Sequence, residues 1–273
     1  MQNRLYGVSP AFFLSLYGQH FSPEEFVQGL DLLAELGFSC YQGEIVTADQ
    51  LAPWLDGGAL LVHHRAQQLG LTLSQFVAHF MLDAFCDRKA VCSDAGIAEI
   101  AQVTRICDLF GKNIQITVPM GRYQESRPDE DALISKLIRI AKIIADSGHR
   151  MALEIQPGAM VQGADAILAC IGHVKYCTGY NFDTGHAWAS GSKNVAEFPL
   201  ILGSAIYGTH LCDNNGIVND SLRPGKGTIA WERLIPNLVA SGYSGSLDLE
   251  IICDARDVPA EYARGLAYMK TLQ

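Results

Sequence analysis

The sequence lacks the features that mark several large classes of protein. None of its eight cysteines forms a Cys-x-x-Cys pair, and several lie in apolar runs, where a free cysteine behaves as a small hydrophobic residue. No apolar run reaches the ~18 residues that a membrane-spanning helix needs. No secretory signal peptide precedes the first predicted strand. These absences predict a cytoplasmic protein with reduced thiols and no membrane partner.

Positive charge is also scarce. The 273 residues include 20 Lys and Arg against 29 Asp and Glu, which gives a net charge of −9 at pH 7. Binding to a phosphate backbone needs a basic face, and the chain has no basic run and no interleaving of basic and aromatic residues. We therefore expect no nucleic-acid partner. Self-association into a homo-oligomer stays open.

Strand-like segments alternate with helical stripes along the whole chain. The predicted strands cover residues 5–9, 38–42, 71–77, 113–118, 151–157, 179–183, 206–213 and 247–251. The predicted helices cover residues 22–37, 60–69, 95–110, 129–146, 164–171, 195–202, 230–240 and 259–272. Residues 86–93 are predicted to form a loop.

Eight strand–helix units without a linker or a break in composition favour one closed (β/α)8 TIM barrel domain over residues 1–273. The length suits such a barrel, which typically takes about 250 residues. Periodicity alone also permits an open doubly wound sheet. No Gly-x-Gly-x-x-Gly follows the first strand, however, and this removes the commonest reason to prefer an open sheet.

The last predicted strand has a polar face. Alternation from Ser246 onwards puts Ser246, Asp248 and Glu250 on one face and the leucines between them on the other. An antiparallel edge strand with one solvated face would show this pattern. A barrel strand with a ligand at the carboxyl end of its inward face would show it too.

Four strand-like segments in the second half end in a residue able to bind a metal: Glu154, Asp183, His210 and Glu250. In a barrel these strands are contiguous, and active sites lie at their carboxyl ends, so the four side chains can reach a common point. Buried carboxylates are costly unless they are paired or bound to a metal. Three carboxylates and one imidazole form a hard donor set, which suits Mn²⁺ or Mg²⁺ and tolerates Co²⁺ or Zn²⁺. We expect one such ion.

At these residues the chain resembles the xylose-isomerase-like TIM barrels, the superfamily of sugar-phosphate isomerases and epimerases that also contains endonuclease IV. The matching segments are Leu153-Glu154, Phe182-Asp183-Thr184-Gly185-His186, His210-Leu211-Cys212-Asp213-Asn214-Asn215-Gly216, Pro224-Gly225-Lys226-Gly227-Thr228-Ile229-Ala230-Trp231 and Leu249-Glu250. They lie in the C-terminal half, and the eightfold pattern extends the resemblance over the whole chain.

The resemblance implies that Glu154, Asp183, His210 and Glu250 bind a single divalent metal ion. It also implies that the two glutamates exchange protons with a substrate carbon.

Three further residues are candidates for substrate binding. In the one-metal members, the histidine that matches His186 contacts substrate oxygens, and Gln156 stands where relatives often place a polar substrate contact. Trp188 comes just after His186 and either lines the pocket or serves as a packing residue.

Departures from endonuclease IV are informative. That enzyme needs an additional histidine where this chain has Val118, and an Asp and a His where this chain has Asn219 and Ser221. The resemblance therefore does not extend to a trinuclear DNA-repair site, and the acidic charge agrees with this.

The resemblance and the ligand set favour a metal-dependent isomerase or epimerase that acts on a keto sugar or related polyol through an enediolate. Glu154 and Glu250 would serve as base and acid. A metal-dependent dehydratase of an inosose- or dehydroshikimate-like substrate shares the first proton abstraction and stays an alternative. A non-catalytic sugar-binding barrel would have no need of two proton-transfer carboxylates.

Overall fold

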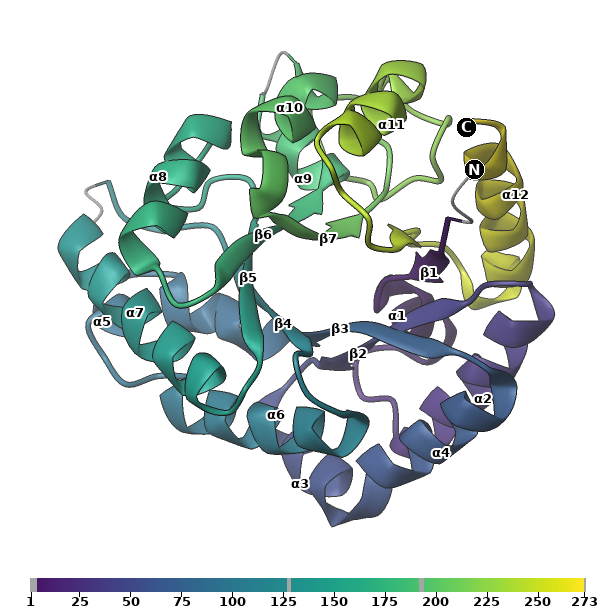
Figure 1. Ribbon diagram of the computed structural model, residues 1–273, viewed down its shortest axis with the longest axis horizontal. Helices are drawn as coiled ribbons and strands as arrows, with labels where there is room; N and C mark the ends of the chain where they lie inside the picture. The colour runs from purple at the N-terminus through teal and green to yellow at the C-terminus, as the bar shows by residue number, and fades with distance from the viewer. Residues whose placement is uncertain (1–3, 127–128, 192–193, 273) are drawn as a thin grey trace.

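The computed structural model describes residues 4–126, 129–191 and 194–272, and its centre is a ring of parallel strands surrounded by helices (Figure 1). The strands are β1 (Tyr6–Val8), β2 (Cys40–Ile45), β3 (Thr72–Ala78), β4 (Gln115–Met120), β5 (Arg150–Ile155), β6 (Thr178–Asp183), β7 (Ile206–His210) and β8 (Leu247–Leu249).

The sheet order β7-β6-β5-β4-β3-β2-β1-β8 leaves only the β7–β8 gap to be closed. Leu211, just after β7, closes it: its N–H donates to the Asp248 carbonyl at 2.8 Å, and its own carbonyl accepts from the Glu250 N–H at 3.0 Å. The predicted (β/α)8 TIM barrel is confirmed. The antiparallel-edge interpretation of the last strand is wrong, because β8 pairs in parallel with β1.

The helices lie outside the ring (Figure 1). They are α1 (Ala11–Tyr17), α2 (Pro23–Glu35), α3 (Leu51–Pro53), α4 (Ala59–Leu69), α5 (Arg88–Val91), α6 (Ile97–Phe110), α7 (Glu130–Asp146), α8 (Ala164–Val174), α9 (Thr184–Ala189), α10 (Phe198–Leu202), α11 (Trp231–Ala240) and α12 (Val258–Thr271). Within the described ranges, no helix is both long and apolar enough to cross a bilayer.

Local capping explains the best-predicted helix start. Ser22 Oγ accepts from the Glu25 N–H at 3.2 Å, and the Glu25 carboxylate accepts from the Ser22 N–H at 2.8 Å. This reciprocal pair satisfies two of the N–H groups that a helix start leaves free.

Short helices escaped sequence analysis. The segment 86–93, predicted as a loop, contains α5, whose first turn is capped by Asp87 accepting from the Ala90 N–H at 2.7 Å. Helix α1 was not predicted, and the predicted helix 195–202 is a 3₁₀ turn (Val195–Glu197) followed by α10. One or two turns are too few for an apolar period to be visible.

The barrel interior is polar near its middle. The buried side chains of Gln42, Gln75, Gln115, Asn181 and Asp248 meet there. Room for them comes from Gly208 on β7, where a Cβ would overlap the Gln115 amide and lie 2.8 Å from both Asn181 Oδ1 and Gln75 Oε1.

We predict that Gly208→Ala lowers the free energy of unfolding by about 1–3 kcal/mol, because the added methyl displaces hydrogen-bonded amides in a packed interior. Gly172→Ala, on an exposed face of α8 where a Cβ meets nothing within 4 Å, is the matched control and should raise stability by up to ~1 kcal/mol. Urea unfolding measures both. Equal effects of the two substitutions would contradict this account of the interior.

Candidate metal-binding active site

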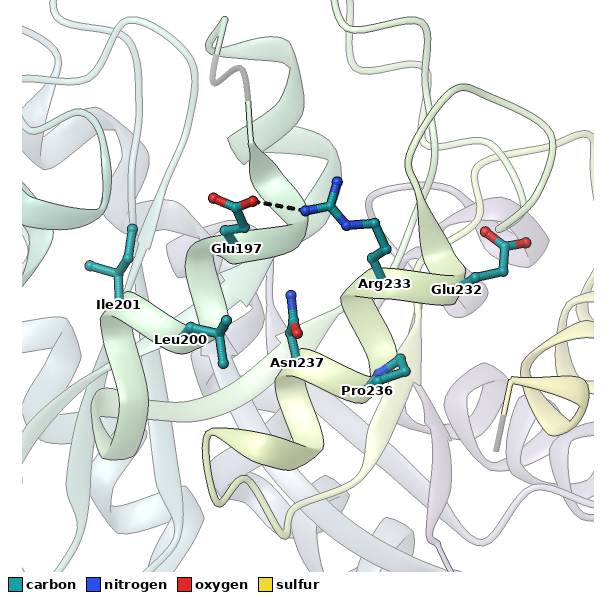
Figure 2. Close-up of a pocket in the computed structure, with 7 residues that line it drawn as sticks. All are labelled: Glu197, Leu200, Ile201, Glu232, Arg233, Pro236 and Asn237. Atoms are coloured by element: carbon teal, nitrogen blue, oxygen red, sulfur yellow. Dashed lines mark hydrogen bonds and ion pairs between the residues drawn. The ribbon is translucent and has the colours of Figure 1, made fainter.

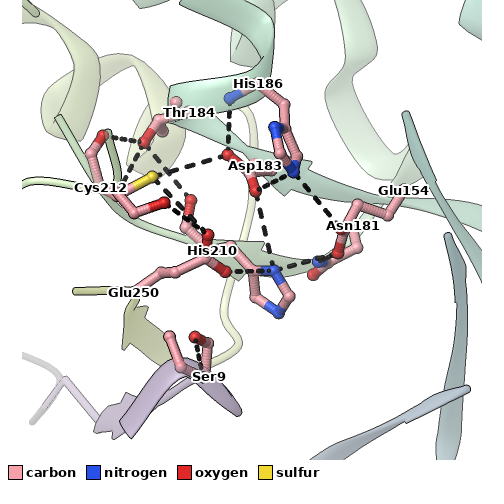
Figure 3. Close-up of polar contacts among 12 residues, drawn as sticks. Ser9, Glu154, Asn181, Asp183, Thr184, His186, His210, Cys212 and Glu250 are labelled. Carbon is pink, nitrogen blue, oxygen red and sulfur yellow. Dashed lines mark hydrogen bonds and ion pairs between the residues drawn. The ribbon is translucent and has the colours of Figure 1, made fainter. Parts of the chain in front are cut away.

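Four strand ends bring the predicted ligands together. Glu154 is the penultimate residue of β5, Asp183 and His210 are the last residues of β6 and β7, and Glu250 follows β8 directly. Figure 3 shows their side chains converging from these neighbouring strands. The barrel geometry therefore places all four at one end of the strands, as the sequence predicts.

The His210 imidazole lies at the centre of the cluster. Its Nδ1 is 3.0 Å from Glu154 Oε2, 2.9 Å from Glu250 Oε2 and 3.9 Å from Asp183 Oδ2. Every side chain is at least about seven-eighths buried, with 14% exposure for Glu250 and less for the others. One nitrogen thus faces three carboxylates with little access to water.

Two atoms of this cluster fit a cation. Asp183 Oδ2 and His210 Nδ1 are buried, and neither has a hydrogen-bond partner of good geometry among the described residues. Buried polar atoms are normally paired, so unpaired donors and acceptors that face one point indicate a missing partner. A divalent ion suits three carboxylates and an imidazole, and the residues present fit it.

Gln42 determines which nitrogen of His210 is available. The Gln42 amide N–H donates to Asp248 Oδ2 at 2.8 Å, a carboxylate oxygen that Ser74 Oγ also reaches at 2.8 Å. This fixes Gln42 Oε1 as an acceptor, 2.8 Å from His210 Nε2. The Nε2 atom therefore carries a proton, and Nδ1 is left to face the carboxylates.

A second buried chain orients Glu154. The Asn181 amide donates to Glu154 Oε2 at 3.0 Å, and its oxygen accepts from the Gln75 amide at 2.9 Å. Gln75 Oε1 in turn accepts from the Thr117 hydroxyl at 2.5 Å and from the Gln115 amide. Each amide in this chain is oriented by the next, so the donor that reaches Glu154 is fixed.

His186 lies beside the cluster, on α9. Its Nε2 is 3.3 Å from Asp183 Oδ2 and 3.8 Å from Glu154 Oε1, so geometry alone would let it join these two carboxylates around an ion. The hydrogen bond at its other nitrogen, Nδ1, argues against this role. Asn219 Oδ1 accepts from the Ser221 N–H at 3.2 Å, which leaves the Asn219 amide N–H to donate to His186 Nδ1 at 3.0 Å. Nε2 then carries the proton and acts as a donor, not a ligand.

Cys212 approaches the same carboxylates. Asp183, Cys212 and Glu250 form a second group whose donor atoms lie within 4.8 Å of one another. Burial, together with the charges of Asp183 and Glu250, raises the pKa of the Cys212 thiol well above its usual value. The protonated thiol is a poor metal ligand, so it packs against the site.

The charges of the cluster depend on one another. Burial disfavours the His210 cation, but Glu154 and Glu250 outweigh it and raise the pKa of His210 well above its usual value. Burial likewise opposes ionisation of Glu154, yet His210 outweighs it and lowers the pKa of Glu154 to about 2. Burial, reinforced by Glu250 and Glu154, raises the pKa of Asp183 to about 7. Without an ion, the cluster therefore holds a proton on His210 and part of one on Asp183 near pH 7.

The other two predicted contacts lie just after β5 and on α9. Gln156 is half-buried just after β5, where its backbone N–H donates to the Met120 carbonyl at 3.0 Å. Trp188 donates its indole N–H to Thr228 Oγ1 at 2.9 Å and packs against Gly216. Trp188 thus holds the loop that follows β7 against α9.

Sequence analysis did not find the contacts that support the ligands, although it placed Asp248 on the same strand face as Glu250. Gln42, Asn181 and Asp248 are inward-facing strand residues, and alternation within their strands was the available signal. Ser221 appeared only as a departure from endonuclease IV, yet its hydroxyl donates to Glu250 Oε1 at 3.3 Å.

A separate cavity of about 470 Å³ lies between α10 and α11 (Figure 2). Glu197 and Arg233 form an ion pair of 2.8 Å across it, and Leu200 and Ile201 are exposed at its edge. Its lining contains no histidine or cysteine, and it lies in the outer helical layer. The candidate metal site is therefore the one at the strand ends.

Residues 30–272 match the family of xylose isomerase-like TIM barrels. The chain belongs to this family. A curated relative, an uncharacterized protein of Methanocaldococcus jannaschii, is 32% identical over 127 residues, which cover 44% of this chain and 43% of the relative. The match thus spans less than half the length of that relative.

Solved structures of two proteins named as epimerases superpose over nearly the whole chain. The D-allulose 3-epimerase of a Methylomonas species, in complex with D-allulose, has a TM-score of 0.78 at 17% identity and covers 99% of this chain and 98% of its own. The 3-keto-D-glucoside 4-epimerase of E. coli has a TM-score of 0.76 at 18% identity, covering 98% of this chain and 100% of its own. At such identities the likeness shows the shared fold.

We predict that Mn²⁺ binding to the metal-free xylose isomerase-like barrel releases about one to two protons per ion at pH 7. The ion takes the place of the proton on His210 and of the fraction of a proton on Asp183. Since both pKa values are raised, protons compete with the ion at lower pH, and affinity should increase as the pH rises. Calorimetry in buffers of different ionisation enthalpy counts the ions and the protons. More than one tight ion per chain, or no proton release, would contradict the assignment.

A second prediction concerns Gln42. Gln42→Leu removes the acceptor that keeps the proton on His210 Nε2, and we expect Mn²⁺ affinity to fall about 10–100-fold, the usual cost of losing a residue that orients a metal ligand. Gln68→Leu, on the exposed face of α4, controls for the substitution. Unchanged affinity in a folded Gln42→Leu variant would show that the tautomer is set in another way.

Proposed function

We propose that the protein is a sugar isomerase or epimerase that requires one divalent metal ion, bound by Glu154, Asp183, His210 and Glu250. The observation that carries this proposal is the placement of Glu154 and Glu250. The two carboxylates come from β5 and β8 and approach the same imidazole nitrogen, at 3.0 and 2.9 Å. The ends of β5 to β8, which carry the four ligands, form an arc of the barrel that we call the ligand arc. Glu154 and Glu250 stand at its two ends and flank the point at which the ion would sit.

A divalent ion held there supplies a Lewis acid that stabilises negative charge developing on substrate oxygens. Glu154 and Glu250 then act on the carbon next to the substrate carbonyl, one as base and the other as acid. Asn181 and Ser221 donate hydrogen bonds to Glu154 and Glu250, which holds each carboxylate in place.

His186 orients the substrate in this proposal. Its Nε2–H is directed at the cluster because Asn219 occupies Nδ1, so it can donate to a substrate oxygen. Gln156 and Trp188 extend the binding surface beside it. Proton return to the opposite face of the same carbon gives an epimer, and return to the neighbouring carbon gives an aldose–ketose isomer.

The substrate we propose is a keto sugar or related polyol. The structural neighbours include enzymes named as epimerases of D-allulose and of a 3-keto-D-glucoside, both of which are sugars. Their likeness supports this substrate class through the fold, and the donor set supports enediolate chemistry.

We predict that the Mn²⁺-loaded enzyme exchanges the proton next to the substrate carbonyl for deuterium in deuterium oxide. The four D-ketohexoses are the probes, and mass spectrometry of substrate and product is the measurement. Glu250→Gln keeps the shape of the side chain but removes one of the two proton-transfer carboxylates, and should slow exchange about 10²–10⁴-fold. Glu232→Gln, exposed on α11, is the control.

Two outcomes would redirect the proposal. Turnover with full retention of the substrate hydrogen would rule out proton transfer by the glutamates. Formation of a product that absorbs as a conjugated enone would show a dehydratase that shares the first step.

A further inference from the structure

A second polar pair stands across the barrel from the ligand arc. Glu44 Oε1 lies 2.8 Å from His79 Nδ1. Glu44 is the penultimate residue of β2, and His79 follows β3, whereas the ligands come from β5 to β8. The Glu44 side chain is 1% exposed and that of His79 is 36% exposed. The pair therefore combines a buried carboxylate with an imidazole that solutes can reach.

Strand alternation sets the direction of Glu44. Gln42, two residues earlier on β2, points into the barrel, where it contacts Asp248 and His210. Glu44 shares that face and lies one layer nearer the carboxyl ends of the strands. The electrostatics agree: burial lowers the pKa of His79, but Glu44, and further away Glu154 and Glu250, raise it to about 9. The pair thus lies close enough to the metal ligands to interact with their charges.

One oxygen of this pair has no partner. Glu44 Oε2 is buried and makes no hydrogen bond within the described residues. A carboxylate oxygen can only accept, so this atom needs a donor, and leaving it unpaired in a buried site is unfavourable. The His79 ring does not satisfy this atom, because its Nδ1 contacts the other oxygen, Oε1.

We propose that Glu44 and His79 bind a hydroxyl group at the end of the substrate remote from the reacting carbons, and that this end carries no phosphate. The hydroxyl donates a hydrogen bond to Glu44 Oε2 and accepts one from the His79 Nε2–H. This inference rests on the proposed function, because it assumes that a sugar spans the mouth from the metal ligands to β2 and β3.

The exclusion of phosphate follows from the same atoms. A phosphate dianion has no proton to donate to Glu44 Oε2 and would face that carboxylate as well as Glu154, Asp183 and Glu250. Phosphate sites normally provide arginine, lysine or backbone N–H groups. An arginine is present in the neighbouring loop: the exposed Arg122 side chain follows β4, the strand next to β3, and packs on Gly158 after β5. The test therefore includes a phosphorylated probe.

Calorimetry with the Mn²⁺-loaded protein tests the proposal. The probes are dihydroxyacetone, which carries only the reacting group, the four D-ketohexoses, and D-fructose 6-phosphate. The best-bound ketohexose should bind at least about 10-fold more tightly than dihydroxyacetone, the scale of hydrogen bonds to a charged group. D-fructose 6-phosphate should bind more weakly than D-fructose.

Variants test whether the tighter binding of the ketohexose comes from Glu44 and His79. Glu44→Gln and His79→Phe should each raise the Kd of the ketohexose about 10-fold and leave the Kd of dihydroxyacetone unchanged. Two exposed substitutions, Glu24→Gln on α2 and His64→Phe on α4, are the matched controls and should change neither value. Two variants are used because either alone could fail to fold.

The possible failures are distinguishable. If no probe binds, the proposed function fails and this inference fails with it. If dihydroxyacetone binds and the ketohexoses bind no more tightly than it does, only the Glu44–His79 assignment is overturned. The same holds if the variants raise the Kd of every probe equally. Tighter binding of D-fructose 6-phosphate than of D-fructose would also overturn it.

Discussion

Three carboxylates that share a buried pocket with one imidazole impose the main constraint on this molecule. The side chains of Glu154, Asp183 and Glu250 surround His210 Nδ1, and burial makes their mutual repulsion expensive. A proton on the imidazole relieves part of this repulsion, and a divalent ion relieves more. The arrangement therefore suits a cation, and the chemistry proposed for it follows from what a cation would do to a sugar carbonyl beside two carboxylates.

The rest of the barrel interior is arranged to keep these side chains in place. Most barrels of this kind fill the interior with branched aliphatic residues. Here two hydrogen-bonded chains of polar side chains run through it instead, one ending on His210 through Gln42 and one ending on Glu154 through Asn181. Because every amide is oriented by its neighbour, the chains fix both a tautomer and a carboxylate position. Residue 208 is a glycine because the amides occupy the space that a Cβ atom would need.

Sequence reasoning predicted the architecture, which the structure confirms, and placed the four candidate ligands at strand ends, because both are local patterns. Apolar periods, helix caps such as Ser22, and a polar residue at each strand end are all visible within a few residues. The supporting contacts are not local: Gln42 and His210 are 168 residues apart, and Gln42 and Asp248 are 206 apart. Pairings across the barrel depend on strand register and tilt, which the sequence does not display. The same reason hid the pairing of Glu44 with His79.

The most direct test of the central claim is anomalous diffraction at the manganese edge from crystals grown with Mn²⁺. The account predicts one peak per chain, coordinated by Glu154, Asp183, Glu250 and the Nδ1 atom of His210, with His186 outside the coordination sphere. A peak bound through His186 or Cys212 instead of His210, or a peak away from the strand ends, would contradict it.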